Sequence, residues 1–334
     1  MYDALLLVGF GAPERLEDVV PFLENVLRGK RVPPQRISEV ARHYELFGGV
    51  SPLAANTRAL LAALRDELKV HGPQLPIYWG NRNWHPMLVD TLREMANAGV
   101  RRALALVLSA FGSYSGCRQY LEDIQRARDE AGPAAPIVDK LRLFYNHPGF
   151  IEPMAEQVAA ALAGIPAERR ATTALVFTAH SIPAAMASTG PYEKQLAEAC
   201  HLVAEQAGDC PWQLAYQSRS GPPNQAWLEP DLGQCLTQLG QDGRTTDVVL
   251  APIGFLSEHM EVVYDLDVEA KATCKRLGLT MVRSGVVGTH PRFIGMIREL
   301  ILERIEPNPV RLSLGTLGPS PDECPATCCW NWRS

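Results

Sequence analysis

Short apolar runs alternate along the chain with longer stretches whose apolar residues recur every three or four positions. Continuous runs that end at glycine, proline or polar residues are typical of buried parallel strands. We predict strands at 3–9, 76–79, 102–108, 141–144, 174–178, 214–216, 247–251 and 280–283. Helical spacing follows most of them, and this repeated strand-loop-helix order predicts α/β architecture with parallel sheets covered on both faces.

The helical spacing divides the chain into two similar parts and a tail. Helices are predicted at about 15–27, 51–70, 118–130 and 291–303. Ser51 and Pro52 are typical of an N-cap and a first helical position, and His85-Pro86 is expected to start another helix. We predict two Rossmann-like domains at 1–148 and 149–290, with a site in the cleft between them. Residues 291–334 are expected to form a final helix and a tail that packs back on the first domain.

One segment after a predicted strand carries acidic residues in register. Residues 257–270 read S-E-H-M-E-V-V-Y-D-L-D-V-E-A, and an α-helix would place Glu261, Asp265 and Glu269 on one face. Carboxylates at this spacing repel by about a few tenths of a kcal/mol per pair, so a cation or a catalytic task would explain them. From spacing alone, a solvated acidic face is equally consistent. The position after an apolar run, and His259 beside the row, favour a functional role.

A histidine follows another predicted strand. His180 lies in A-H-S-I-P, where Ser181 and Pro183 restrain the turn behind it. Most loop histidines are structural or solvated, but an imidazole held at a cleft can accept protons near neutral pH. A neutral base facing a carboxylate row predicts a reaction that takes up a cation and releases protons.

Composition and charge narrow the class of protein and its cellular location. The 334 residues are 46% apolar and 21% charged, with a net charge of -5, so we expect a globular protein without a nucleic-acid partner. Asp3 stands where a signal peptide needs basic residues, and the apolar run behind it is too short for a membrane anchor. We therefore expect a cytoplasmic protein whose eight cysteines are free thiols or metal ligands.

Four ordered segments together resemble the ferrochelatase family. They are Y-E-L-F-G-G-V-S-P-L at Tyr44, H-S-I-P at His180, Y-Q-S-R-S-G-P at Tyr216 and S-E-H-M-E-V-V-Y-D-L-D-V-E at Ser257. This family inserts ferrous iron into a porphyrin between two Rossmann-like domains, a reaction that displaces two pyrrole protons. The resemblance implies catalytic roles for His180, Glu261 and His259, and an iron path through His180, Glu261, Asp265 and Glu269.

Two further segments resemble one branch of that family. S-Y-S-G-C-R-Q-Y at Ser113 and G-N-R-N-W at Gly80 are similar to the actinobacterial-type soluble branch, whose substrate is coproporphyrin III. We therefore expect iron insertion into coproporphyrin III in haem biosynthesis. The alternatives are protoporphyrin IX as substrate, a cobalt or nickel chelatase of a sirohydrochlorin-type ring, and a non-catalytic haem or porphyrin carrier.

The resemblance also implies a porphyrin site. Arg28 is the expected propionate partner. Phe10 stands where well-known members have a tyrosine able to ligate iron, so we expect its ring to pack on the macrocycle instead. The implied lining is Phe10, Arg28, Tyr44, Ser51, Ser113 and Tyr114.

The last part of the chain suggests a metal centre. A [2Fe-2S] cluster takes four thiolates, and C-P-A-T-C-C supplies Cys324, Cys328 and Cys329. Cluster-bearing members of the family pair three such cysteines with one at the S-Y-S-x-C position, which implies Cys117. A zinc site with the same sulfurs, or an unliganded tail, are the alternatives. We expect a monomer that takes porphyrin and Fe(II) and hands its product to a downstream enzyme of haem synthesis.

Overall fold

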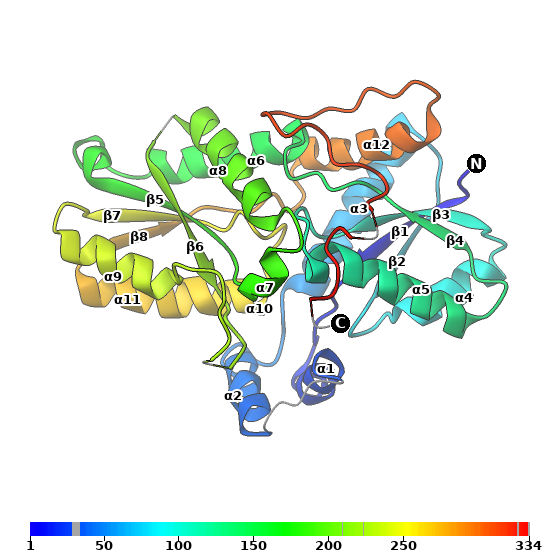
Figure 1. Ribbon diagram of the computed structural model, residues 1–334, viewed down its shortest axis with the longest axis horizontal. Helices are drawn as coiled ribbons and strands as arrows, with labels where there is room; N and C mark the ends of the chain where they lie inside the picture. Colours follow the sequence, from blue (N-terminus) through cyan, green and yellow to red (C-terminus); the bar gives the residue numbers. More distant parts are fainter. Residues whose placement is uncertain (29–33, 209, 223, 326, 333–334) are drawn as a thin grey trace.

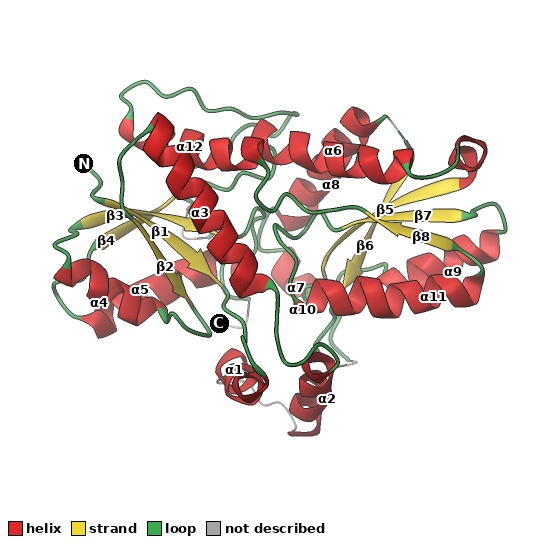
Figure 2. Cartoon of the chain, turned by 180° about the vertical axis from the view of Figure 1, so that it is seen from behind, coloured by secondary structure: helices red, strands yellow, loops and turns green. Residues whose placement is uncertain are grey.

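Two α/β halves lie side by side in this computed structural model, which describes residues 1–28, 34–208, 210–222, 224–325 and 327–332 (Figure 1). Each half is built on a parallel sheet of four strands, with helices on both faces (Figure 2). The α/β architecture predicted from the alternating runs is confirmed.

The two sheets have the same strand order. The first runs β2-β1-β3-β4 and the second β6-β5-β7-β8, and all neighbours are parallel. The central strands β1, β3, β5 and β7 are mostly apolar and buried along most of their length because helices cover both faces of each sheet. The strands are β1 (Ala4–Gly9), β2 (Ile77–Asn81), β3 (Arg102–Val107), β4 (Ile137–Lys140), β5 (Thr173–His180), β6 (Trp212–Gln217), β7 (Asp247–Ala251) and β8 (Thr280–Arg283).

The helices vary from single turns to five turns. They are α1 (Val19–Val26), α2 (Pro34–Glu45), α3 (Leu53–His71), α4 (Leu88–Asn97), α5 (Gln119–Ala131), α6 (Pro148–Ala163), α7 (Ala184–Ala187), α8 (Tyr192–Ala207), α9 (Leu232–Asp242), α10 (Met260–Val262), α11 (Lys271–Leu277) and α12 (Pro291–Ile305). Short 3-10 helices occur at η1 (Leu16–Asp18) and η3 (Ala167–Thr172), and π-helices at η2 (Tyr114–Arg118) and η4 (Val263–Ala270).

Several local predictions were wrong. The fourth strand is β4, just before the predicted 141–144, because those residues are buried in the core after the chain has left the sheet. Helix α2 was not predicted at all. Helix α3 begins one residue later than expected with Pro52 at its N-cap, although the Ser51 hydroxyl still lies 3.4 Å from the Leu53 amide. Helix α4 begins at Leu88 rather than at His85-Pro86.

Two helices, α6 and α12, each follow the sheet of one half in the sequence but pack on a helix of the other half; we call them the exchanged helices. Helix α6 follows the first sheet but packs on α8 of the second half, while α12 follows the second sheet and packs on α3 of the first. The two exchanged helices also pack on each other (Figure 2). Both begin with a His-Pro pair whose imidazole accepts a backbone hydrogen bond, from Gly149 to His147 Nδ1 at 3.0 Å and from Arg292 to His290 Nδ1 at 3.2 Å. We propose the division 1–148, 149–290 and 291–334 on this pattern.

A buried arginine binds both the last turn of α12 and the chain beyond it to the first half. Arg142 binds both carboxylate oxygens of Glu303 at 2.6 and 2.8 Å, and both side chains are almost fully buried. The same guanidinium donates to the Leu312 carbonyl at 2.8 Å. The tail therefore begins from a fixed point on the first half.

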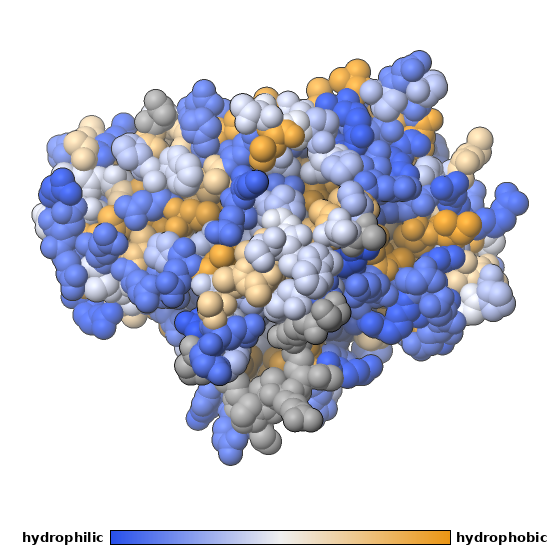
Figure 3. Space-filling model, in the orientation of Figure 1, coloured by the Kyte–Doolittle hydropathy of each residue, from blue (hydrophilic) through white to orange (hydrophobic). Residues whose placement is uncertain are grey.

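The surface shows no extended apolar region on the face drawn in Figure 3, where hydrophilic residues predominate and hydrophobic ones form separate groups. Among the described helices, none combines the length and apolar character needed to cross a bilayer.

Candidate functional site

His180 and Glu261 face each other from different strand ends of the second half. His180 is the last residue of β5, and Glu261 lies in α10, which the chain reaches from β7. His180 Nε2 lies 3.6 Å from Glu261 Oε2, and both side chains are partly exposed. The Ser181 carbonyl lies 2.5 Å from Nδ1, which therefore carries the proton and donates it. Nε2 is left as the ring nitrogen that can accept a proton on the side of Glu261.

His259 shares the electrostatic environment of this pair. Its ring contacts Phe255 edge-on, with centroids 5.1 Å apart. Burial lowers the pKa of His259, the Glu261 charge opposes that shift, and His180 adds to it. His259 is therefore held neutral beside the His180–Glu261 pair.

The acidic row continues from Glu261 but on a different type of helix. Asp265 and Glu269 lie on the π-helix η4 and not on the α-helix that the sequence reasoning considered. Their charges nevertheless interact: burial raises the pKa of Asp265 to about 6, the Ser218 hydrogen bond opposes the rise, and Glu261 and Glu269 add to it. The row is one coupled group of carboxylates, with Asp265 the least exposed of them.

Neighbouring acids in the same segment are neutralised, whereas the row is not. Arg283 pairs with Glu258 at 2.6 Å and with Asp267 at 2.8 Å. In the described part of the chain, no lysine or arginine forms an ion pair with Glu261, Asp265 or Glu269. A carboxylate row without a basic partner is suited to a cation.

Gln217 and Ser218, to which the sequence reasoning gave no role, hold Asp265 in place. The Gln217 amide donates to Asp265 Oδ2 at 3.1 Å, and the Ser218 hydroxyl donates to the same oxygen. Ser218 adopts φ of 60°, a left-handed conformation that is uncommon for serine. Gln217 ends β6 directly beside His180 in the sheet register. The sequence did hold one indication of a role for Gln217 and Ser218, because both are polar residues at the carboxyl end of a predicted strand.

Phe10 and Tyr44 belong to one aromatic group on the first half. Phe10 is 39% exposed, and its ring lies 6.2 Å from Phe22, which in turn lies 6.2 Å from Tyr44 and from Trp84. Burial, and then the charge of Glu261, raises the pKa of Tyr44 well above its usual range. The aromatic group of the first half therefore reaches the acidic row of the second.

Arg82 is a third residue to which the sequence reasoning gave no role. Its guanidinium lies 2.8 Å from Asp123, with both side chains buried. Its flat face lies 5.9 Å from the Phe10 ring and 4.8 Å from the Tyr120 ring. Arg82 thus braces the loop that presents Phe10.

The other expected lining residues are engaged locally. Ser113 caps η2 by accepting from the Gly116 amide at 3.0 Å, and the Tyr114 hydroxyl donates to Glu122 at 2.9 Å. Burial and this bond raise the pKa of Tyr114 to about 12, so its hydroxyl is neutral. Arg28 is exposed just beyond α1 and donates to Asn25 at 2.5 Å. Ser51 is buried beside α3.

The structure brings the four predicted cysteines into one neighbourhood. Cys117 is buried on η2, and the sulfurs of Cys328 and Cys329 lie 3.7 Å apart. Burial, then Cys328 and Cys117, raises the pKa of the Cys324 thiol to about 11, and the same groups raise the pKa of Cys329. In the described residues, no three metal-ligating side chains are close enough together to hold a metal ion.

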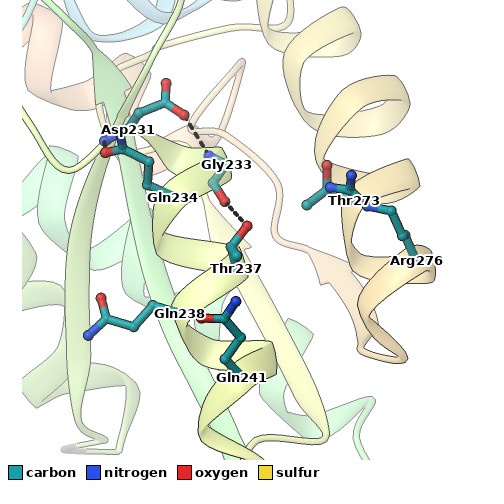
Figure 4. A pocket seen from close by; sticks show the side chains of 8 residues that line it. All are labelled: Asp231, Gly233, Gln234, Thr237, Gln238, Gln241, Thr273 and Arg276. Carbon is teal, nitrogen blue, oxygen red and sulfur yellow. Dashed lines mark hydrogen bonds between the residues drawn. The ribbon is translucent and has the colours of Figure 1, made fainter.

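A surface hollow lies away from all these residues, between α9 and α11 (Figure 4). Asp231 caps α9 there by accepting from the Gly233 amide at 2.8 Å, and Thr237 donates to the Gly233 carbonyl at 2.7 Å. Asp231 and Thr237 are thus bonded within α9, and the hollow contains none of the candidate catalytic or metal-binding residues described above.

Comparison with known proteins agrees with this arrangement. The family described as Ferrochelatase matches residues 2–305. A ferrochelatase of Rhodopirellula baltica is 52% identical over 328 residues, covering 98% of this chain and 93% of that protein. A coproporphyrin III ferrochelatase of Streptomyces coelicolor is 51% identical over 352 residues, with the same coverage. The solved structure of SirB from Bacillus subtilis with Fe3+ has a TM-score of 0.52 at 14% identity, covering 91% of this chain and 98% of that one, and shares the fold. The chain belongs to the ferrochelatase family.

Proposed function

We propose that this member of the ferrochelatase family inserts ferrous iron into coproporphyrin III. The observation that carries the proposal is the His180–Glu261 pair, in which an imidazole nitrogen lies 3.6 Å from a carboxylate oxygen. Beside it is a carboxylate row that pairs with no lysine or arginine of the described residues. Insertion consumes Fe(II) and releases two pyrrole protons, so it needs a proton acceptor and a route for a cation. Relatives named coproporphyrin III ferrochelatase, about half identical to this chain, support the choice of porphyrin.

In the proposed mechanism, His180 takes a pyrrole proton on Nε2. The Ser181 carbonyl fixes Nδ1 as the donor, so the free lone pair is on the nitrogen that faces Glu261. The nearby carboxylate then stabilises the imidazolium that forms, by an opposite charge at short range. His259, held neutral by burial, adds a nitrogen donor beside the pair without adding a competing positive charge.

Asp265 and Glu269 are proposed to guide Fe(II) towards Glu261. A row of carboxylates with unbalanced charge attracts a divalent cation and supplies the oxygen ligands that replace its water. Gln217 and Ser218 keep the Asp265 side chain in the row. Iron would therefore approach from the acidic side of the macrocycle.

The first half is proposed to hold the porphyrin. The exposed ring of Phe10 offers an apolar surface to the macrocycle, and Tyr44 stands between that ring system and Glu261. Ser51, Ser113 and Tyr114 complete the proposed lining. Arg28 is exposed and carries the positive charge suited to a propionate.

A side-by-side metallation assay tests this function. Coproporphyrin III and protoporphyrin IX are each supplied with Fe(II), without oxygen, and kcat/KM is compared. We expect coproporphyrin III to be preferred, because its two additional propionates can meet Arg28 and neighbouring donors. Equal constants would contradict the substrate, and no metallation of either porphyrin would contradict the activity. Preference for cobalt or nickel and a sirohydrochlorin-type ring would favour the alternative chelatase.

We further propose that Cys117, Cys324, Cys328 and Cys329 hold a [2Fe-2S] cluster. Four thiolates are the donor set that such a cluster takes. Cys117 and Cys329 are buried, and the sulfurs of Cys328 and Cys329 lie 3.7 Å apart. Such a cluster would supply four iron–sulfur bonds between the tail and η2. A tetrahedral zinc site would use the same sulfurs.

Metal and sulfide analysis distinguishes these two possibilities. Protein purified without oxygen is expected to show the visible absorption of an iron–sulfur cluster, with iron and acid-labile sulfide in equal amounts. Cys117→Ser is expected to lose that absorption, whereas Cys200→Ser, at a buried thiol of α8, is the control. Colourless wild-type protein that contains zinc or no metal would contradict the cluster.

We place the protein in the cytoplasm as a monomer. The product would pass by transient contact to a downstream enzyme of haem synthesis.

A further inference from the structure

The end of the chain lies across the junction of the two halves. We call residues 327–332 the strap, which runs through the middle of the molecule to the C-terminus (Figure 1). On the second half, the Cys329 amide donates to the Thr189 carbonyl at 2.9 Å. On the first half, Arg118 donates to the carbonyls of Cys328 at 3.1 Å and Pro325 at 3.0 Å. The strap is therefore bonded to both halves.

The partners of the strap belong to segments next to the proposed site. Thr189 ends the stretch that starts at His180 and passes through α7. Arg118 is the last residue of η2, which begins at Tyr114. These two segments also contact each other, because the Ser115 hydroxyl lies 3.6 Å from the Met186 sulfur. The position of the strap is thus tied to the segments that carry the base and the proposed porphyrin lining.

Trp332 makes the most direct contact of this kind. Its ring meets the Tyr114 ring at 75°, with centroids 5.7 Å apart, an edge-to-face arrangement that aromatic pairs favour. Both side chains also pack against the main hydrophobic core. At its far end the Tyr114 hydroxyl is bonded to Glu122. Tyr114 is consequently fixed at two points, and one of them comes from the C-terminus.

We infer that Trp332 is a positioning residue for porphyrin binding, acting through Tyr114. The inference rests on the proposed function, in which Tyr114 lines the porphyrin site. A ring held on one face by tryptophan presents a fixed surface to the macrocycle, so substrate binding does not have to restrain it. The tail thereby contributes to the substrate site without touching the reacting nitrogens.

Trp330 provides a matched control. It is two residues earlier in the same strap and is 44% exposed, whereas Trp332 is partly buried against the core. Replacing either residue by alanine removes the same side chain from the same part of the chain. Only one of the two replacements removes a contact with Tyr114.

Binding of metal-free coproporphyrin III to the full-length protein tests the inference, measured by porphyrin fluorescence together with steady-state metallation. We expect Trp332→Ala to raise the dissociation constant and KM about three- to tenfold, the worth of one aromatic pair, with kcat within about twofold of wild type. Trp330→Ala should bind as wild type does, and Trp332→Phe should recover most of the affinity. Wild-type affinity in Trp332→Ala, or equal losses in both alanine variants, would overturn the inference.

A double-mutant cycle separates action through Tyr114 from general loosening of the tail. If Trp332 acts through Tyr114, the variant Tyr114→Ala/Trp332→Ala should bind no more weakly than Tyr114→Ala alone. Additive losses would overturn the inference while leaving the proposed function intact. Failure of the wild-type protein to bind coproporphyrin III would overturn the proposed function itself, and this inference with it.

Discussion

The π-helices η2 and η4 occupy corresponding places in the two halves but carry opposite chemistry. Each follows the strand third in its sheet order, β3 or β7. Each helical stretch is entered through an extended residue, Ser113 with φ −143° and ψ 172°, or His259 with φ −147° and ψ 172°. π-helical turns are often found at functional sites. The same scaffold is therefore available on both sides of the molecule, and its side chains determine what each side does.

The difference between the two segments is one of charge. The row on α10 and η4 carries three carboxylates that pair with no lysine or arginine of the described residues, which suits a cation. The segment η2 carries Tyr114 and Cys117, and the pKa of Tyr114 is raised to about 12, so its phenol is neutral. A flat, largely apolar macrocycle and a divalent ion need different surfaces, and we propose that each half provides one of them. The following experiments, from the largest expected effect to the smallest, test that contrast.

Removing the base should abolish the reaction but not the fold. His180→Ala is expected to lower kcat at least about a hundredfold, because general base catalysis contributes roughly that much or more. Porphyrin should still bind, since the proposed lining lies on the first half. His201→Ala, at an exposed position of α8, is the control for loss of a histidine. Near-normal turnover of His180→Ala would remove this residue from the mechanism.

Substitution of the three carboxylates of the row should lower activity to different extents. Glu261→Gln is expected to lower kcat about ten- to a hundredfold, because Glu261 Oε2 lies 3.6 Å from His180 Nε2. Asp265→Asn and Glu269→Gln should each cause smaller losses, seen mainly at low Fe(II) concentration. Glu205→Gln, on the exposed face of α8, controls for loss of a surface charge. Equal behaviour of the three row variants would indicate a merely solvated acidic face.

The Asp265 carboxylate should lower the free energy of unfolding at neutral and alkaline pH. Its pKa is raised to about 6, mainly by burial, so the folded protein keeps a proton that the unfolded chain has already released near pH 4. The free energy of unfolding therefore falls as pH rises from about 4 to 6 and stays lower above that range. Asp265→Asn should gain about 1 to 3 kcal/mol at pH 8 and little at pH 4. Urea unfolding of both proteins at the two pH values measures this, and a gain that is the same at both would contradict it.

His147 and His290, which cap α6 and α12, should contribute unequally to the free energy of unfolding, and we expect this to be the smallest effect in the series. His290→Ala removes a cap and is expected to lower the free energy of unfolding by about 1 kcal/mol, with His290→Asn restoring most of it. His147 is fully buried with its pKa lowered to about 3, so His147→Ala also leaves a cavity and should cost more. Urea titrations compare the variants. A smaller loss at His147 than at His290 would contradict this ranking.

Most of the fold followed from apolar runs, while the exceptions have physical causes. Buried parallel strands have continuous apolar runs, and such runs make up most of β1, β3, β5 and β7, so these strands could be predicted directly. Residues 141–144 have the same composition because they are buried, and composition does not reveal which backbone groups pair. The helical type of η4 was likewise hidden, since α- and π-helices differ in hydrogen-bond register rather than in hydrophobic pattern.

The site was predictable where a residue type alone suggests chemistry. His180 and the carboxylates could be identified because a base and a row of acids stood at strand ends. Gln217, Ser218 and Arg82 act by holding other residues, and that role depends on contacts between distant parts of the chain. All three lie in segments that resemble the family, but their residue types alone do not reveal which side chains they hold.

The exchanged helices have a consequence for how the protein is made on the ribosome. The first sheet is complete at residue 140, but α12, which packs on α3, is synthesised only at residues 291–305. Arg298 of this late helix bonds the Gly72 carbonyl just after α3 at 2.7 Å. Part of the apolar surface of the first half therefore stays uncovered during synthesis until α12 has been translated, after most of the second half. A chain stopped at residue 290 would expose that surface permanently, so the two halves reach the folded state together.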